Sequence, residues 1–116
     1  AAVWGAAGGG ATIQSCMITT TGSPVLVTTT ANVFPNPNNG TNLESAINIL
    51  RDSTQLMNQD IYCPGTTGHP IYLPMTTSYV DSGLAAGTYT YYTKLAGITG
   101  TIKAQYRSMW VMEVKR

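Results

Sequence analysis

Short apolar runs, alternating or β-branched, recur along the chain and are separated by turn residues. Alternation and β-branching predict strands, and Gly, Pro and Asn clusters predict the turns between them. The predicted strands are residues 12–21, 24–30, 55–62 and 71–75, then a β-meander formed by 86–95 and a last strand over 108–116. Their short spacing favours an all-β fold, a single jelly-roll-like β-sandwich over residues 12–116, rather than a βαβ fold.

Residues 43–50 fit two patterns. Leu43, Ala46, Ile47 and Leu50 have the i, i+3, i+4, i+7 spacing of an amphipathic helix. Ile47 and Ile49 alternate equally well with polar neighbours, as in a strand. Periodicity leaves both open, and the β character of the rest of the chain favours a strand.

The C-terminal strands carry apolar residues on faces that need cover, and the last strand does so on both of its faces. Tyr89 and Tyr91 share one face of the first strand, and Trp110 and Met112 share one face of the last, whose opposite face is also apolar. A sheet with one side in water should alternate apolar and polar residues. We therefore expect a second sheet to cover one face and a neighbouring subunit to cover the other. These four residues are the candidate subunit interface.

Turn-rich stretches at 32–42, 63–70 and 79–85 predict surface loops. Exposed loops on a rigid β scaffold often carry binding residues. The candidate binding residues are Asn36, Asn38, Asn39, Thr66 and His69. Residues 39–41 also match the N-glycosylation pattern, but an Asn-Gly pair is itself a turn signal, which is the interpretation we prefer.

Residues 1–11 lack periodicity and include three consecutive glycines. Glycine loses much conformational entropy on ordering, so this stretch predicts a flexible N-terminal arm or linker. Trp4 is its one large side chain and the candidate for docking on a partner protein. The stretch lacks the basic start and long apolar centre of a signal peptide.

Composition narrows the possible partners. Charged residues are 9% of the 116, against about 25% in an average soluble domain, while 43% are hydrophobic and the net charge is +1. An apolar fraction this high excludes a disordered chain, and a net charge near zero favours association. Six Lys and Arg without a basic stripe argue against nucleic-acid binding. No apolar run is long enough to predict membrane insertion.

Catalytic and metal-binding patterns are missing from the sequence. The single histidine, His69, has no companion ligands at metal-site spacing, and the five acidic residues are scattered. There is no nucleophile-elbow sequence and no phosphate-binding loop. We therefore expect no enzyme activity, metal or cofactor. Cys16 and Cys63 could form a disulfide, but one pair in a domain of this size favours two buried thiols.

Several short segments resemble the C-terminal head domains of tailed-phage fibres and related virion spikes. They are residues 22–27, 50–54, 86–92, a Gly-Thr hairpin at 97–101, and 108–116. The resemblance covers residues 22–116. It implies a jelly roll similar to the tumour-necrosis-factor-like knob, a homotrimer whose strand faces meet at the threefold axis, and a place on the virion exterior. Such heads present loops to host-surface glycans or proteins without catalysis, and the arm would contact other virion proteins.

Two other functions fit the same pattern. One is a capsid decoration or cementing protein whose arm, with Trp4, clamps neighbouring subunits. The other is a secreted carbohydrate-binding module with a Cys16–Cys63 disulfide. An ordered arm lying on another protein would favour the first of these, and the disulfide would favour the second.

Overall fold

The computed structural model describes residues 3–5, 9–35, 43–63, 72–99 and 102–115, and every regular element in those ranges is a strand. The strands are β1 (Val3–Gly5), β2 (Gly9–Thr20), β3 (Val25–Pro35), β4 (Leu43–Arg51), β5 (Thr54–Cys63), β6 (Leu73–Asp81), β7 (Gly87–Thr99) and β8 (Ile102–Glu113). Within these ranges there is no helix that could cross a membrane.

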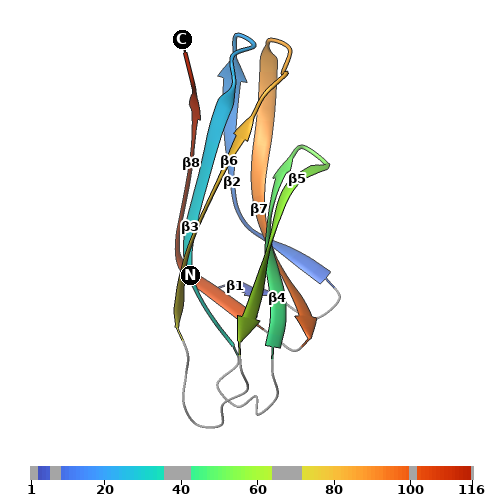
Figure 1. Cartoon of the computed structure of the whole chain (residues 1–116), viewed down its shortest axis with the longest axis vertical. Helices are drawn as coiled ribbons and strands as arrows, with labels where there is room; N and C mark the ends of the chain where they lie inside the picture. The colour runs from blue at the N-terminus through green and yellow to red at the C-terminus, as the bar shows by residue number, and fades with distance from the viewer. Residues whose placement is uncertain (1–2, 6–8, 36–42, 64–71, 100–101, 116) are drawn as a thin grey trace.

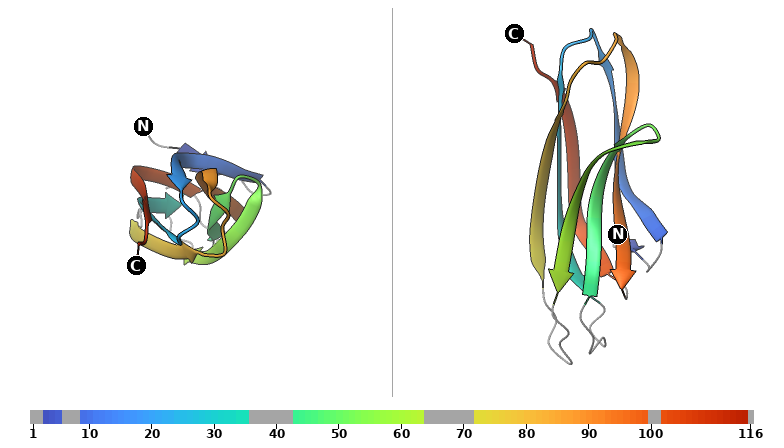
Figure 2. Two further views of the ribbon diagram at one scale, coloured as in Figure 1. Left: turned by 90° about the horizontal axis from the view of Figure 1, so that it is seen from above. Right: turned by 45° about the vertical axis from the view of Figure 1, so that its right-hand side comes forward.

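Two antiparallel sheets of four strands pack face to face (Figures 1 and 2). Sheet A has the order β1-β8-β3-β6 and sheet B the order β2-β7-β4-β5. Only β4 and β5 are neighbours both in sequence and in a sheet, and this interleaving is the jelly-roll arrangement. The predicted all-β jelly-roll-like sandwich is confirmed. Most of the strands run along the long axis of a body measuring 50 × 22 × 21 Å, whereas the short β1 lies across it (Figure 1).

The positions of the strands agree with the sequence prediction better than their pairing does. The predicted C-terminal meander is wrong, because β7 pairs with β2 and β4 whereas β8 pairs with β1 and β3. Turn residues mark where a strand ends but do not tell a hairpin from a crossing between sheets. Residues 43–50 form the strand β4, as favoured. The loop expected at 79–85 begins later, since β6 continues to Asp81, and β3 extends to Pro35.

Part of the expected N-terminal arm belongs to the sandwich. In β1, Val3 lies opposite Ala104 and Gly5 opposite Ile102 of β8. The strand β2 already begins at Gly9, opposite Gly97 of β7. Pairing with the chain's own strands satisfies the backbone groups on the inner side of these two edge strands.

Inward-facing apolar residues form two clusters along the long axis. The upper end is defined here as the end with the β2–β3 turn and the β6–β7 connection, and the lower end as the opposite one (Figure 1). The upper cluster contains Val25, Val27, Ile49 and Tyr91. The lower cluster contains Ile13, Ala31, Val33, Ile47, Ile61, Leu95, Ile102 and Ala104. Burying each large apolar side chain contributes roughly 1.5–3 kcal/mol.

A polar layer crosses the core between these clusters. Thr29 of β3 and Thr93 of β7 are both buried, and the Thr93 hydroxyl lies 3.0 Å from the Thr29 hydroxyl. The side-chain amide of Gln14 donates to the same Thr29 oxygen and, at 2.9 Å, to the Ser108 carbonyl. At the other side of the sandwich the Thr77 hydroxyl donates to Gln59. These hydrogen bonds join sheet A to sheet B at mid-length.

A β-bulge in β8 reverses which residues face inward. Thr30 lies opposite Ser108 and Asn32 opposite Gln105, so Ala31 faces two residues of β8, Tyr106 and Arg107. Even-numbered residues such as Ile102 point inward before the bulge, and odd-numbered residues such as Val111 do so after it. Tyr106 has a φ of 51°, in the left-handed region. This conformation costs a non-glycine residue about 1–2 kcal/mol.

The polar layer can be tested by Thr29→Val, which keeps the β-branched shape but removes the hydroxyl. Gln14 would keep only the Ser108 carbonyl as an acceptor, and Thr93 only the Met109 sulfur at 3.6 Å, so we expect the free energy of unfolding to fall by about 1–3 kcal/mol. Urea unfolding followed by circular dichroism measures it. The matched control is Thr30→Val, at the adjacent outward-facing position, which should cost less than half as much. Equal losses would contradict a stabilising role for the layer.

Candidate functional site

The outward side of sheet A carries a continuous uncharged surface, here called the outer face. The register places its residues in three rows across β8, β3 and β6. The rows are Met112–Leu26–Val80, Trp110–Thr28–Ser78 and Ser108–Thr30–Thr76. Trp110, Met112 and Val80 are about half exposed, at 48%, 50% and 54%. Large apolar side chains grouped in this way mark an interaction surface.

Hydroxyl groups on the outer face bond to one another across the strands. The Thr28 and Ser78 hydroxyls lie 3.1 Å apart, and the Thr30 and Ser108 hydroxyls also form a hydrogen bond. A polar group that already has a partner costs much less to remove from water than an unpaired one. Another protein surface can therefore cover the outer face without leaving these hydroxyls unsatisfied.

Two of the four candidate interface residues lie on this surface. Trp110 and Met112 point outward from β8, as expected. Tyr91 is instead fully buried in the upper cluster, and Tyr89 packs half-buried against it. For these two tyrosines the interface prediction is corrected, because period-2 spacing groups residues on one face without telling which face turns inward. Leu26 and Val80 complete the outer face, and their spacing in sequence does not mark them as outward-facing.

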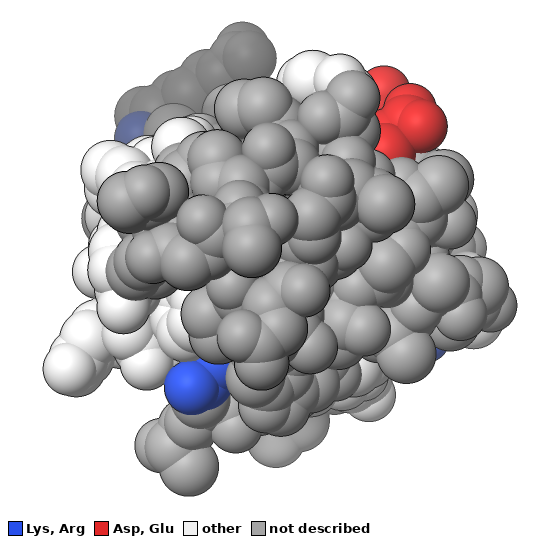
Figure 3. All heavy atoms as spheres, turned by 90° about the horizontal axis from the view of Figure 1, so that it is seen from below, with Lys and Arg blue, Asp and Glu red and all other residues white. Residues whose placement is uncertain are grey.

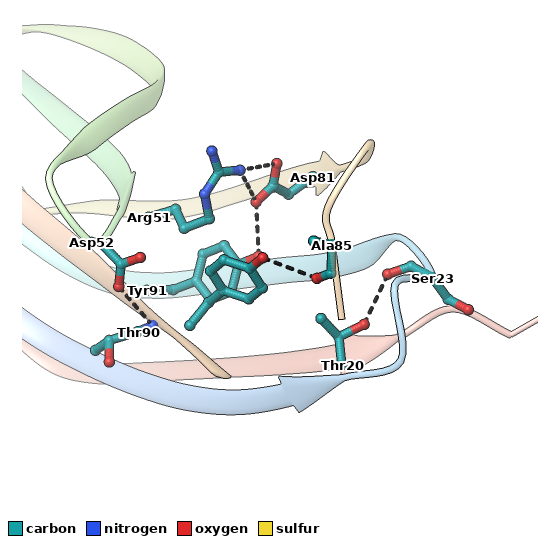
Figure 4. Close-up of polar contacts among 9 residues, drawn as sticks. Thr20, Ser23, Arg51, Asp52, Asp81, Ala85, Thr90 and Tyr91 are labelled. Carbon is teal, nitrogen blue, oxygen red and sulfur yellow. Dashed lines mark hydrogen bonds and ion pairs between the residues drawn. The ribbon is translucent and has the colours of Figure 1, made fainter. Parts of the chain in front are cut away.

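An ion-paired cluster closes the upper end of the core beneath this surface (Figure 4). Nη1 of Arg51 lies 2.7 Å from both carboxylate oxygens of Asp81, and the Tyr91 hydroxyl donates to Asp81 at 2.8 Å. The Asp81 side chain is 5% exposed. The Arg51 guanidinium also lies 5.8 Å from the centre of the Tyr89 ring. Asp81 thus joins the edge strand β6 to β4 and β7 of the other sheet.

The protonation of this cluster suits a structural role. Burial, followed by the hydrogen bond to Asp81, raises the pKa of Tyr91 well above its ordinary value. The hydrogen bond to Asp81 likewise raises the pKa of Arg51. Both groups therefore stay protonated near neutral pH and serve as hydrogen-bond donors. Across the described ranges, no three His, Cys, Asp or Glu side chains gather in a way that could hold a metal ion.

Arg51 does not pair with Asp52, its neighbour in sequence. Neighbouring residues at the end of a strand point in different directions, and Arg51 turns inward to Asp81. Asp52 starts the β4–β5 turn with a φ of 50°, a conformation that Asp tolerates better than most residues. Its amide donates to the Thr90 carbonyl at 2.8 Å, and its carboxylate accepts from the Thr90 amide at 3.1 Å (Figure 4).

Glu113 fastens the end of β8 to the β2–β3 turn at the upper end. One carboxylate oxygen accepts from the Thr21 hydroxyl, from the Thr21 amide at 2.8 Å and from the Thr20 hydroxyl at 2.9 Å. These hydrogen bonds, those of Thr21 first, lower the pKa of Glu113 to about 2. The Val114 amide also donates to the Pro24 carbonyl at 2.7 Å.

The candidate binding residues Asn36, Asn38, Asn39, Thr66 and His69 lie outside the described residues. The strands that flank them, β3, β4, β5 and β6, have their adjoining ends at the lower end (Figure 1). Figure 3 views this end, and both basic and acidic side chains are visible among the described residues around it. For Trp4 the structure gives the backbone position in β1, opposite Lys103.

The strand register rules out a disulfide between Cys16 and Cys63 within one chain. Cys16 lies opposite Tyr91, and Tyr91 lies opposite Arg51 at one end of β4. Cys63 lies opposite Leu43, at the other end of β4. Nine strand residues separate those levels by about 26 Å, and a disulfide needs Cα atoms within about 7 Å. Cys16 is a half-buried free thiol rather than a fully buried one, and the side chain of Cys63 lies outside what the structure describes.

No protein-family model matches the chain, and no curated protein resembles it significantly in sequence.

Tyr91→Phe tests the cluster at the upper end. The substitution removes only the hydroxyl that donates to the buried Asp81, and hydrogen bonds to charged groups contribute about 1.5–3 kcal/mol. We expect that loss in the free energy of unfolding, measured with urea at fixed protein concentration. Tyr89→Phe is the matched control, because its hydroxyl donates to the exposed Ala85 carbonyl, and it should cost about 1 kcal/mol or less. A larger loss in the control would argue against a special role for Asp81.

Glu113 should make stability depend on acid pH. Its pKa is lowered in the folded state, so its contribution is complete above the ordinary value of 4.5 and is lost as the pH falls toward 2. Glu113→Gln should flatten the decline in melting temperature over that window and lower stability at neutral pH. Thr21→Val, which removes one donor, should flatten it in part. An unchanged slope in Glu113→Gln would contradict the assignment.

Proposed function

We propose that the chain is a non-enzymatic structural protein of a tailed-phage virion, a trimeric β head that serves host attachment on the particle's exterior. The observation that carries this proposal is the outer face. It is uncharged and half apolar, although the core between the sheets is already complete without it. A face of this kind needs cover from outside the chain, and a subunit interface provides it.

The outer face lies along the side of the sandwich, so it suits lateral assembly. A standard interface takes about 800 Å² from each partner, so residues of β8, β3 and β6 beyond these nine would also take part. A second copy of the same face brings no like charges into contact, because none of its nine residues is charged. The threefold order comes from the resemblance to phage-fibre heads, whose strand faces meet at the axis.

The other functions are less well supported. A carbohydrate-binding module stabilised by Cys16–Cys63 loses its disulfide, because the two residues lie at opposite ends of sheet B. A decoration protein would clamp its neighbours through a free arm. Residues 3–5 of that arm pair with β8 instead, so fewer residues remain for such a clamp. In the head, contacts with other virion proteins involve the remainder of the arm, and a host glycan or protein binds at the lower-end connections. No metal, cofactor or nucleic acid takes part.

Light scattering over a dilution series tests the assembly. We expect three times the chain mass of 12.3 kDa, stable to dilution into the low micromolar range. Trp110→Ser and Met112→Ser should each weaken assembly about 10- to 100-fold, as expected for truncating a central apolar anchor. Met17→Ser is the matched control, since Met17 is 67% exposed on β2 of the opposite sheet, and it should not change the mass. A wild-type monomer at every concentration would refute the proposal.

A further inference from the structure

Tyr106 combines backbone strain with high exposure. Its φ of 51° lies in the left-handed region, which a bulky residue rarely adopts. Its side chain is 81% exposed, the highest value among the large hydrophobic residues of the described chain. Within the described ranges its ring forms no hydrogen bond and no aromatic or cation–π contact. The ring therefore contributes little to the stability of the isolated chain.

The bulge itself does not require a tyrosine. Glycine adopts the left-handed conformation without strain, and Asn adopts it more readily than an aromatic residue. Either would keep the extra residue that reverses the inward-facing pattern of β8. Strained residues that the fold does not need are concentrated at binding sites. The exposed ring thus points to a role outside the chain.

We infer that Tyr106 is a contact residue for a second copy of this chain and fixes the position of the neighbouring subunit along β8. This inference rests on the proposed function, because it concerns the same assembly. Tyr106 precedes Trp110 by four residues, which is about 13 Å along the strand. Its side chain therefore extends the line of exposed side chains that Trp110 and Met112 form along β8. Beside it the strand leads into the uncharged outer face, which suits the uncharged face of another copy better than a charged partner.

A bulge also fixes the position of a partner along a strand better than a regular strand does, because a bulge breaks the two-residue repeat. The rows of the outer face repeat every two residues, so a partner could shift along them by one row and find similar contacts. The ring of Tyr106 occurs once and does not follow that repeat. A partner that accommodates it is held in one register, and the ring buries apolar area at low conformational cost.

Tyr106→Gly and Tyr106→Asn test the inference, with Tyr62→Thr as the matched control. Tyr62 is 63% exposed on β5, away from the outer face. Dissociation is measured by sedimentation velocity over a dilution series, and folding of the dissociated chain by circular dichroism and urea unfolding. We expect both Tyr106 variants to dissociate at least 10-fold more readily, with the dissociated chain as stable as the wild type or more so. Tyr62→Thr should assemble normally.

The outcomes separate this inference from the proposed function. If the wild type assembles and both Tyr106 variants assemble equally well, the role of Tyr106 is overturned and the assembly stands. If the wild type is a monomer at all concentrations, both are overturned. If the variants keep wild-type assembly but lose binding to a panel of neutral glycans, Tyr106 is a sugar contact and the inference is again overturned. Loss of stability in the dissociated variants would also overturn it, because the ring would then be structural.

Discussion

Thr29 holds the two sheets together at the middle of the sandwich. Its hydroxyl accepts from Gln14 of β2 and from Thr93 of β7, so a single buried oxygen ties the centre of sheet A to two strands of sheet B. Apolar contacts alone would allow the sheets to slide, because they are not directional. Directional hydrogen bonds in a low-dielectric core fix the relative position of the sheets. The outer face is formed by β8, β3 and β6 of the sheet that these hydrogen bonds hold in place.

Two of the described carboxylates are bonded at the upper end. Asp81, shared by Arg51 and Tyr91, closes the core there, and Glu113 ties the last strand to a turn. The middle of the outer face, by contrast, is held by hydroxyl pairs and apolar rows. This division suits a chain with few charged residues: each buried or bonded carboxylate is satisfied inside the fold, and the broad faces remain free to meet uncharged surfaces.

Much of the fold could be predicted from residue patterns, whereas strand pairing could not. The β-branched run of β3 and the alternation in β4 identify strands locally, since side-chain direction follows from the backbone. That β7 and β8 belong to different sheets depends on contacts between residues far apart in sequence, which turn residues do not encode. The same limit applies to the site. Trp110 and Met112 were found from their spacing, but Tyr91 shares that kind of spacing and is buried. The strain at Tyr106 and the partner of Arg51 have no sequence signal, because one is a backbone angle and the other a contact across thirty residues.

The bulge in β8 has a consequence for how the chain reaches its native state. Beyond it, Met109 and Val111 face the core and Trp110 and Met112 face outward, so the two sides of this segment are almost equally apolar. Hydrophobicity alone then barely distinguishes the native docking of β8 from one shifted by a single residue. Two local features select the native register of β8. One is the left-handed residue Tyr106, which reverses the alternation, and the other is the Glu113 carboxylate, which accepts hydrogen bonds from the threonines of the β2–β3 turn only in that register. The last strand is therefore prone to pair in a shifted register during folding. Correcting that register depends on groups at the two ends of this segment rather than on the apolar residues between them.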